Sequence, residues 1–219
     1  MVIAIDGPAG SGKSTTAKFV AEKLGFIHIN TGAMYRGIAL KCIQGDINME
    51  NSSQLNHLLT NTKFKFAKEG GSTLVMDGVD ISAEITSAQV TDFVSYVSTI
   101  SAVREKLVQY QRDMAEGIDV VLEGRDIGTV VFPNAEYKFF LVADIHERAK
   151  RRKKEMDAKG EVVSLEELTS EMEKRDRKDS TRRHSPLKKA EDAVEIDTTG
   201  ISIEEQVNRI VEIVNKTIK

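Results

Sequence analysis

The sequence contains one cysteine, no tryptophan and three prolines among 219 residues, and aromatic side chains make up only 5%. A single cysteine, Cys42, cannot close an internal disulfide, so a secreted scaffold held together by disulfides is excluded. The apolar pattern GIALKCI around Cys42 predicts a half-buried helix position and no reactive thiol. The four histidines lack the spacing of zinc ligands, and we expect no zinc site.

Long apolar runs are also missing. No run approaches about 18 residues, which argues against a membrane-spanning helix. The first apolar run begins at Val2, which leaves no room for a signal peptide, and we expect a cytoplasmic protein. With 40% hydrophobic and 30% charged residues, the chain reads as globular. Its length suits a single domain over residues 1–219 with a small insertion, and we expect a monomer.

Net charge is only −3, but basic residues concentrate in two segments, 148–154 and 174–189. Such clusters can bind nucleic acid or form a solvated helix face. Acidic residues are interleaved with them and aromatic residues do not cluster there, so we expect no nucleic-acid partner. Arginines in such number are also suited to surrounding phosphorylated small molecules.

The most informative motif is GPAGSGKST, which lies between the apolar run VIAID and a helical pattern. It meets the spacing G-x-x-x-x-G-K-[ST] in the strand, turn and helix context that a phosphate-binding P-loop requires. An ordinary glycine-rich turn is the alternative. In a P-loop, backbone N–H groups and the helix dipole bind phosphate, the lysine reaches the β- and γ-phosphates, and the serine hydroxyl ligates Mg²⁺. The expected ATP-phosphate site is Gly7, Pro8, Ala9, Gly10, Ser11, Gly12, Lys13, Ser14 and Thr15, with Ser14 as the metal ligand.

Apolar runs separated by helical patterns predict parallel strands joined by crossover helices. We therefore expect a three-layer, doubly wound α/β fold of the P-loop NTPase class, with ligands at the carboxyl ends of the strands. The expected strands are 2–6, 26–29, 119–123, 137–142 and 193–197.

Two segments interrupt this alternation. Short alternating runs over residues 63–85, with Gly70-Gly71 and Asp77-Gly78 as turns, predict a small antiparallel insertion within about 60–90. Two charged helices joined around Gly160 predict a helical lid over about 148–165, whose arginines have no evident acidic partners; a plain surface turn is the alternative.

Among P-loop proteins, a GTPase would read guanine through an Asn/Thr-Lys-x-Asp motif, which is missing here. NTKF at 61–64 begins like that motif, but Phe64 and Lys65 follow where it needs an aspartate. The arginine-rich second half favours a kinase, which must bring an acceptor to the γ-phosphate. Another small-molecule kinase, acting on adenylate or shikimate, and a nucleotide switch or RNA-binding module remain the rival hypotheses.

Together with the P-loop, the segments TGAMYR (31–36), VREKL (103–107), GRDIGTVVFPNA (124–135), ERAKRR (147–152), KRDRKDSTRRHSPL (174–187) and DTTG (197–200) resemble the bacterial-type cytidylate kinases. The resemblance is colinear from about residue 2 to the C-terminus. It implies transfer of the γ-phosphate of ATP to CMP or dCMP with Mg²⁺, in pyrimidine nucleotide metabolism. It also implies that the insertion helps to bind the nucleoside monophosphate.

The resemblance also implies individual roles. Residues matching Thr31, Arg104, Asp126 and Arg182 contact the cytosine, those matching Tyr35, Ser95, Arg175 and Asp179 surround the sugar, and those matching Arg36 and Arg125 hold the acceptor phosphate. Arg148 and Arg152 match lid arginines that close over the transferring group; with Lys13 and Arg125 they are the expected catalytic residues. A carboxylate at Asp126 accepts from the cytosine amine and opposes the uracil carbonyl.

Several of these residues have simpler alternatives. Arg104 on an amphipathic helix would ordinarily face solvent, Tyr35 would pack in the core, and Asp176 and Asp179 would form surface ion pairs. Two positions depart from the family pattern: Asn30 and Glu123 stand where aspartate is usual, which puts any role in magnesium or phosphate placement in doubt. Asp144 follows a strand, as a Walker B aspartate would, but its alternative is to cap the next helix.

Overall fold

A computed structural model describes residues 1–66, 73–158 and 160–217. Two sheets organise the chain. The larger is a parallel sheet in the order β2-β6-β1-β7-β8, and the smaller is an antiparallel sheet in the order β3-β4-β5. The large sheet comprises β1 (Val2–Asp6), β2 (Ile27–Asn30), β6 (Val120–Gly124), β7 (Tyr137–Val142) and β8 (Val194–Asp197), and the small sheet comprises β3 (Phe64–Phe66), β4 (Leu74–Met76) and β5 (Val79–Asp80).

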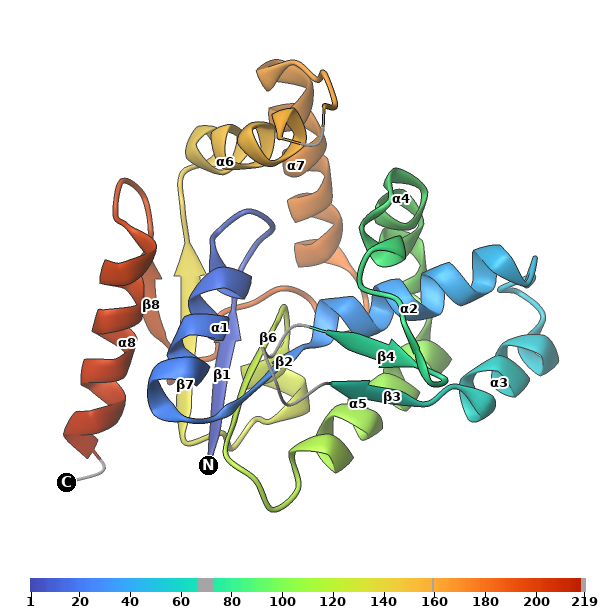
Figure 1. Cartoon of the computed structure of the whole chain (residues 1–219), viewed down its shortest axis with the longest axis horizontal. Coiled ribbons are helices and arrows are strands. Elements are labelled where there is room, and N and C mark those ends of the chain that lie inside the picture. The colour runs from blue at the N-terminus through green and yellow to red at the C-terminus, as the bar shows by residue number, and fades with distance from the viewer. Residues whose placement is uncertain (67–72, 159, 218–219) are drawn as a thin grey trace.

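Helices cover both faces of the large sheet (Figure 1). The helices of the described chain are α1 (Lys13–Leu24), α2 (Thr31–Gln44), α3 (Ser52–Asn61), α4 (Ala88–Val97), α5 (Ser101–Ala115), α6 (Ile145–Asp157), α7 (Leu165–Thr181) and α8 (Ile203–Thr217). Short helical turns span Glu84–Thr86 and Ile127–Val131, the second with π-helical geometry. In the described ranges, no helix is long and apolar enough to cross a membrane.

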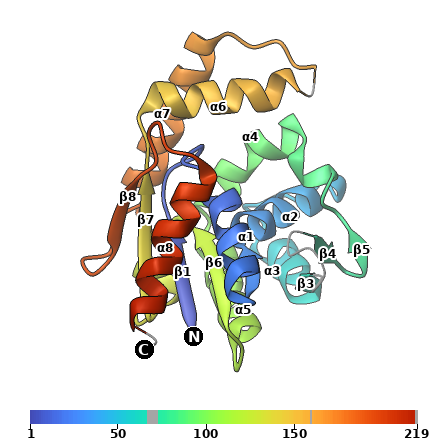
Figure 2. The ribbon, with the colours of Figure 1, turned by 60° about the vertical axis from the view of Figure 1, so that its left-hand side comes forward.

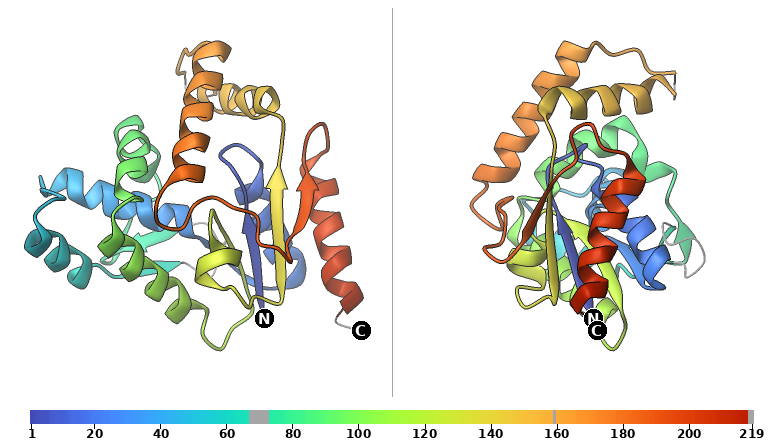
Figure 3. Two further views of the ribbon diagram at one scale, coloured as in Figure 1. Left: turned by 180° about the vertical axis from the view of Figure 1, so that it is seen from behind. Right: turned by 90° about the vertical axis from the view of Figure 1, so that its left-hand side faces the viewer.

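The alternation of side chains along β1 explains the three layers. Ile3 and Ile5 belong to a core with α1 and α8, whereas Ala4 between them belongs to the core on the opposite face, with α2 and α5. Figure 2 brings α1 and α8 forward, and Figure 3 shows the opposite face from behind. A strand buried on both faces needs apolar residues throughout, as the VIAID run indicates. The doubly wound α/β fold is therefore confirmed.

The small sheet packs against α2 through a glycine. A Cβ atom built on Gly37 of α2 would lie 2.9 Å from the ring of Phe64 and 3.1 Å from Ile81. Only a residue without a side chain allows this close approach. The antiparallel sheet in the 63–85 segment is confirmed, while the expected turn at Gly70-Gly71 lies outside the described residues.

Helices α6 and α7 stand above the carboxyl ends of the strands (Figures 1 and 3). Asp144 caps α6, its Oδ1 accepting from the backbone N–H groups of His146 and Glu147 at 2.9 and 3.3 Å. The capping alternative for Asp144 is therefore correct. Cys42, in contrast, is 2% exposed, so the expectation of half burial is wrong: α2 is covered on more than one side.

Candidate active site

The loop between β1 and α1 depends on its glycines. Gly10 and Gly12 have φ of 73° and 88°, in the left-handed region that side chains disfavour. A Cβ on Gly7 would lie 2.3 Å from the carbonyl oxygen of Leu141, so β7 approaches the loop too closely for any other residue. Gly12 caps α1 without a side-chain hydrogen bond, which leaves the first N–H groups of the helix available to an anion.

Lys13 is the first residue of α1 and is 8% exposed. Its Nζ donates to the carbonyl oxygen of Pro8 at 3.3 Å. Burial, followed by the positive charge of Arg125, lowers the pKa of Lys13 from 10.5 to about 7. A phosphate placed in the loop would supply the negative charge that this buried ammonium group requires.

A cavity of about 270 Å³ opens beside Lys13. Its lining includes Lys13 and Ser14 together with every residue expected to contact CMP: Thr31, Tyr35, Arg36, Ser95, Arg104, Arg125, Asp126, Arg175, Asp179 and Arg182. These side chains come from α2, α4, α5, α7 and the loop after β6, and are brought together from positions up to about 150 residues apart in the chain. Their roles as ligand contacts stay predictions.

Asp126 lies between two buried arginines. It accepts a hydrogen bond from Arg104 and lies 3.8 Å from Arg182. The Arg104 guanidinium group also lies over the Tyr35 ring, 5.4 Å from its centroid, and donates to the carbonyl oxygen of Ser98 at 3.2 Å. Arg104 is 4% exposed, so the alternative of a solvent-facing arginine is wrong.

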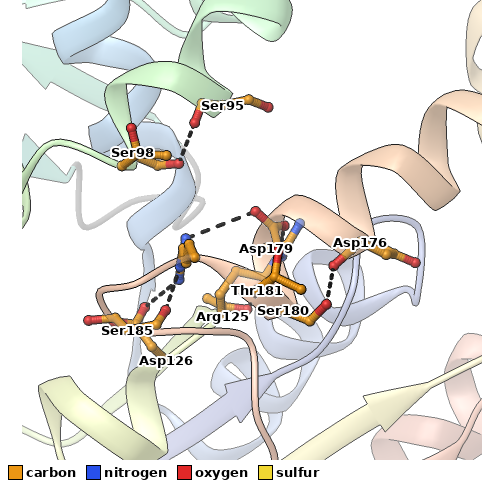
Figure 4. A network of polar contacts seen from close by, with 12 residues as sticks. Ser95, Ser98, Arg125, Asp126, Asp176, Asp179, Ser180, Thr181 and Ser185 are labelled. Atoms are coloured by element: carbon orange, nitrogen blue, oxygen red, sulfur yellow. Dashed lines mark hydrogen bonds and ion pairs between the residues drawn. The ribbon is translucent and has the colours of Figure 1, made fainter.

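A second pair joins the loop after β6 to α7. Nε of Arg125 donates to Oδ2 of Asp179 at 2.9 Å, as Figure 4 shows beside Asp126. Asp179 is buried, so this pair is not a surface ion pair. Nearby, Arg175 has a buried Nε for which the described structure shows no partner, and burial together with Arg125 lowers its pKa to about 10.

Positive charge dominates the cavity. Among the described lining residues, six are cationic and three carry carboxylates. Cationic groups therefore exceed anionic ones in the lining, and the phosphate groups of two ligands would offset this excess of positive charge. Electrostatically, the arrangement suits a doubly phosphorylated complex better than a neutral ligand.

The two departures from the family pattern have different structural consequences. Asn30 caps α2, its Oδ1 accepting from the N–H of Ala33 at 3.0 Å. Glu123, the residue before the last in β6, lines the cavity and is 2% exposed, and its Oε1 has no partner in the described structure. Its main-chain carbonyl accepts from the hydroxyl of Thr31 at 2.8 Å. Asn30 therefore stabilises the start of α2, whereas Glu123 lines the cavity with one carboxylate oxygen that lacks a partner in the described structure.

The two arginines expected in the lid do not line the cavity. Arg148 donates to the carbonyl oxygens of Ala9 and Ala143 at 3.0 and 3.1 Å and pairs with Asp176 at 2.7 Å. Arg152 pairs with Glu155 at 3.0 Å. The expectation that these arginines lack acidic partners is wrong, because α7 and the next turn of α6 supply carboxylates. Their part in catalysis stays a prediction.

Three further residues near the P-loop were not singled out from the sequence. Arg151 donates to the carbonyl oxygen of Thr198 at 2.6 Å, and the Thr198 hydroxyl donates to the carbonyl oxygen of Ser11 at 3.0 Å. Asp6, the last residue of β1, is 4% exposed and bonds to the loop after β6. An acidic residue directly after a buried apolar run was the available signal for Asp6, whereas only the DTTG segment pointed toward Thr198.

A crystal structure of an uncharacterized protein from Eubacterium ventriosum ATCC 27560 aligns over 98% of both chains with a TM-score of 0.54 at 14% identity, which indicates a shared fold alone. Cytidylate kinases from Desulforamulus reducens and Pediococcus pentosaceus are 51% and 48% identical over 98% and 99% of this chain and 96% of theirs. The cytidylate kinase family model matches residues 3–216. The chain belongs to the cytidylate kinase family.

Proposed function

We propose that the cavity beside Lys13 binds CMP or dCMP and that the chain transfers the γ-phosphate of ATP to it, giving ADP and CDP or dCDP. The observation that carries this proposal is the convergence of the cytosine, sugar and phosphate candidates on one cationic cavity next to a phosphate-binding loop. Membership of the cytidylate kinase family supports the same reaction.

Base recognition follows from hydrogen-bond chemistry. Cytosine offers an N4 amine as donor and N3 and O2 as acceptors. Asp126 accepts only, and Arg104 and Arg182 donate only, so the three side chains match the three positions in type. Their mutual contacts in the cavity hold them in place before a base arrives. Uracil presents a carbonyl toward the carboxylate, and like lone pairs would oppose each other.

The transfer step requires positioning and charge stabilisation. A phosphate oxygen of CMP attacks the γ-phosphorus in line, the bond to the β-phosphate oxygen breaks, and ADP leaves with the bonding electrons. The acceptor phosphate is already largely ionised at neutral pH, so no side chain must remove a proton. Lys13, Arg36 and Arg125 hold the phosphates and offset the charge that spreads over the transferring group.

The oxygen donors at the site fit Mg²⁺. Ser14 and Glu123 both line the cavity, and the buried Oε1 of Glu123 has no partner in the described structure. Hydroxyl, carboxylate and water oxygens are the ligands that Mg²⁺ takes. We propose that Ser14 ligates the ion and that Glu123 holds one of its waters. When bound, Mg²⁺ neutralises phosphate charge and orients the β- and γ-phosphates.

A panel assay tests the proposal. ADP release would be measured with ATP and each of CMP, dCMP, UMP and AMP, with and without Mg²⁺. We expect turnover with CMP and dCMP, less with UMP and none with AMP. Highest turnover with AMP would favour another small-molecule kinase. RNA binding that weakens with salt, without acceptor-stimulated turnover, would favour a binding module.

We also propose that the enzyme acts as a monomer in the cytoplasm, where ATP and nucleoside monophosphates occur. The cavity lies within one chain and all its candidate ligand contacts come from that chain. Light scattering of the purified protein should give about the chain mass of 24.3 kDa. Twice that mass would overturn the monomer.

A further inference from the structure

The loop that carries Arg125 and Asp126 leads into a buried segment whose first backbone N–H groups need hydrogen-bond acceptors. Directly after these residues, the chain turns into the π-helical segment Ile127–Val131. The first N–H groups of a helical segment have no partner within it. Ile127 is fully buried and Gly128 is buried as well, so water cannot satisfy their N–H groups. Each buried donor left without an acceptor would cost about 1–3 kcal/mol.

Asp6 satisfies both donors from a different part of the chain. Its Oδ1 accepts from the N–H of Ile127 at 2.9 Å, and its Oδ2 accepts from the N–H of Gly128 at 2.7 Å. A Cβ on Gly128 would lie 3.5 Å from Oδ2 and 3.2 Å from the Lys138 side chain, so the carboxylate and the loop pack tightly. One side chain therefore fixes two consecutive peptide groups.

The position of Asp6 gives these bonds a second consequence. Asp6 is the last residue of β1, directly before Gly7, and its backbone pairs in register with Gly124 of β6. The P-loop and the loop carrying Arg125 and Asp126 therefore leave the sheet side by side, and the Asp6 side chain bridges them. Burial raises the pKa of Asp6 to about 7, which marks a carboxyl group held where its charge is costly.

We propose that Asp6 is a positioning residue that sets the Arg125 and Asp126 loop against the P-loop, and thereby controls the affinity for the acceptor nucleotide. Asp6 does not line the cavity, so it acts through the loop and not by touching the substrate. The inference rests on the proposed CMP site, because the loop forms the part of the cavity that is expected to bind CMP. It predicts that a defect at Asp6 falls mainly on CMP and far less on ATP.

The test uses Asp6→Asn in the full chain. The amide has nearly the same shape but only one acceptor, and it turns an NH₂ group toward one of the two N–H donors. We expect the KM for CMP to rise about tenfold or more, with kcat and the Kd of ATP alone each changing less than threefold. Amide exchange in the 124–132 segment should become faster in the same variant.

Asp192→Asn is the matched control. Asp192 pairs at 2.6 Å with Lys138, whose ammonium group also contacts the carbonyl oxygen of Pro133 just beyond the turn. The Asp192 side chain is 64% exposed and lies outside the cavity. Its substitution should therefore leave the KM for CMP and the Kd of ATP unchanged. If Asp6→Asn fails to fold, Gly128→Ala probes the same contact from the other partner, and its KM for CMP should rise about threefold.

Equal weakening of CMP binding and ATP binding would show that Asp6 stabilises the fold in general. An unchanged KM for CMP despite faster amide exchange would show that the loop does not set the affinity for the acceptor nucleotide. Either result overturns the inference while leaving the proposed function intact. Failure of the wild-type protein to use CMP would instead overturn the proposed function, and the two failures are thus distinguishable.

Discussion

The donor side and the acceptor side of the cavity are built in different ways. The P-loop is shaped by its backbone: Gly7, Gly10 and Gly12 adopt conformations or approaches that a side chain would prevent. The acceptor side is shaped by side chains, in which Asp126 and Asp179 hold three arginines between them. A backbone site tolerates almost no substitution at its glycines, whereas a side-chain network should lose affinity or selectivity in steps.

The largest effect is expected from Gly7→Ala. The new Cβ would lie 2.3 Å from the Leu141 carbonyl oxygen, so β7 and the loop must separate, and the free energy of unfolding should fall by about 3 kcal/mol or more. Gly25→Ala is the control, because Gly25 has a φ of 71° but nothing within 4 Å of the new Cβ. It should cost about 1–2 kcal/mol. Urea unfolding of both variants makes the comparison, and equal losses would mean that close packing does not shape the loop.

Lys13→Ala should reduce turnover at least about 10²-fold, because the ammonium group would no longer offset charge on the transferring phosphate. Within the described residues, its ammonium group donates a single long hydrogen bond, at 3.3 Å to the carbonyl oxygen of Pro8, so the free energy of unfolding should change little. Lys18→Ala, on the exposed side of the same helix, removes the same charge without reaching the cavity and should keep full activity. Near wild-type turnover in a folded Lys13→Ala variant would contradict a role for Lys13 in binding the transferring phosphate.

The same contrast explains what the sequence could predict. The P-loop was predictable because one short segment contains every residue of the turn, with the strand and helix on either side visible as apolar patterns. The five strands of the large sheet and the antiparallel insertion were predictable for the same reason: periodicity is local. Resemblance to a family added the acceptor residues, which no spacing within the chain relates to one another.

The hydrogen-bond partners of side chains such as Arg148 and Asp6 were not predictable from the sequence. Arg148 reaches the Ala9 carbonyl oxygen 139 residues away, and Asp6 reaches Ile127 across 121 residues. Such contacts depend on which loops the sheet order places together. The order of β6, β1 and β7 is a property of the whole fold. An arginine in the sequence at position 148 is equally compatible with a mobile side chain in a lid and with one held by hydrogen bonds.

The two arginines of α6 should therefore separate into different roles. Arg148→Ala would leave Asp176 and two carbonyl oxygens without their donor, and should lower the free energy of unfolding by about 2 kcal/mol. Arg152 is half exposed, and its pair with Glu155 contributes less than about 1 kcal/mol, so Arg152→Ala should leave stability unchanged. If Arg152 closes over the transferring group, its loss should lower kcat about tenfold.

Thermal unfolding and steady-state kinetics on both variants measure this difference. Loss of kcat without loss of stability in Arg148→Ala would mean that the fixed arginine leaves Asp176 during the reaction. Full activity of Arg152→Ala would contradict a lid role for Arg152. Amide exchange over 148–165 that is slowed only when ATP and CMP analogues bind together would support closure, and equal exchange in all states would favour a static turn.

The smallest of these effects concerns selectivity on the acceptor side, and Asp126→Asn should lower the ratio of kcat/KM for CMP over UMP about tenfold. The carboxylate can only accept hydrogen bonds, whereas the amide can rotate to donate to uracil O4. Asp179→Asn is the matched control, because it removes the same charge from the same arginine network, at a position expected to face the sugar. Asp179→Asn should lower kcat/KM for CMP and for UMP by the same factor. If both variants lower CMP activity while the ratio stays constant, Asp126 only holds Arg104 and Arg182 in place, and base selectivity must come from the arginines themselves.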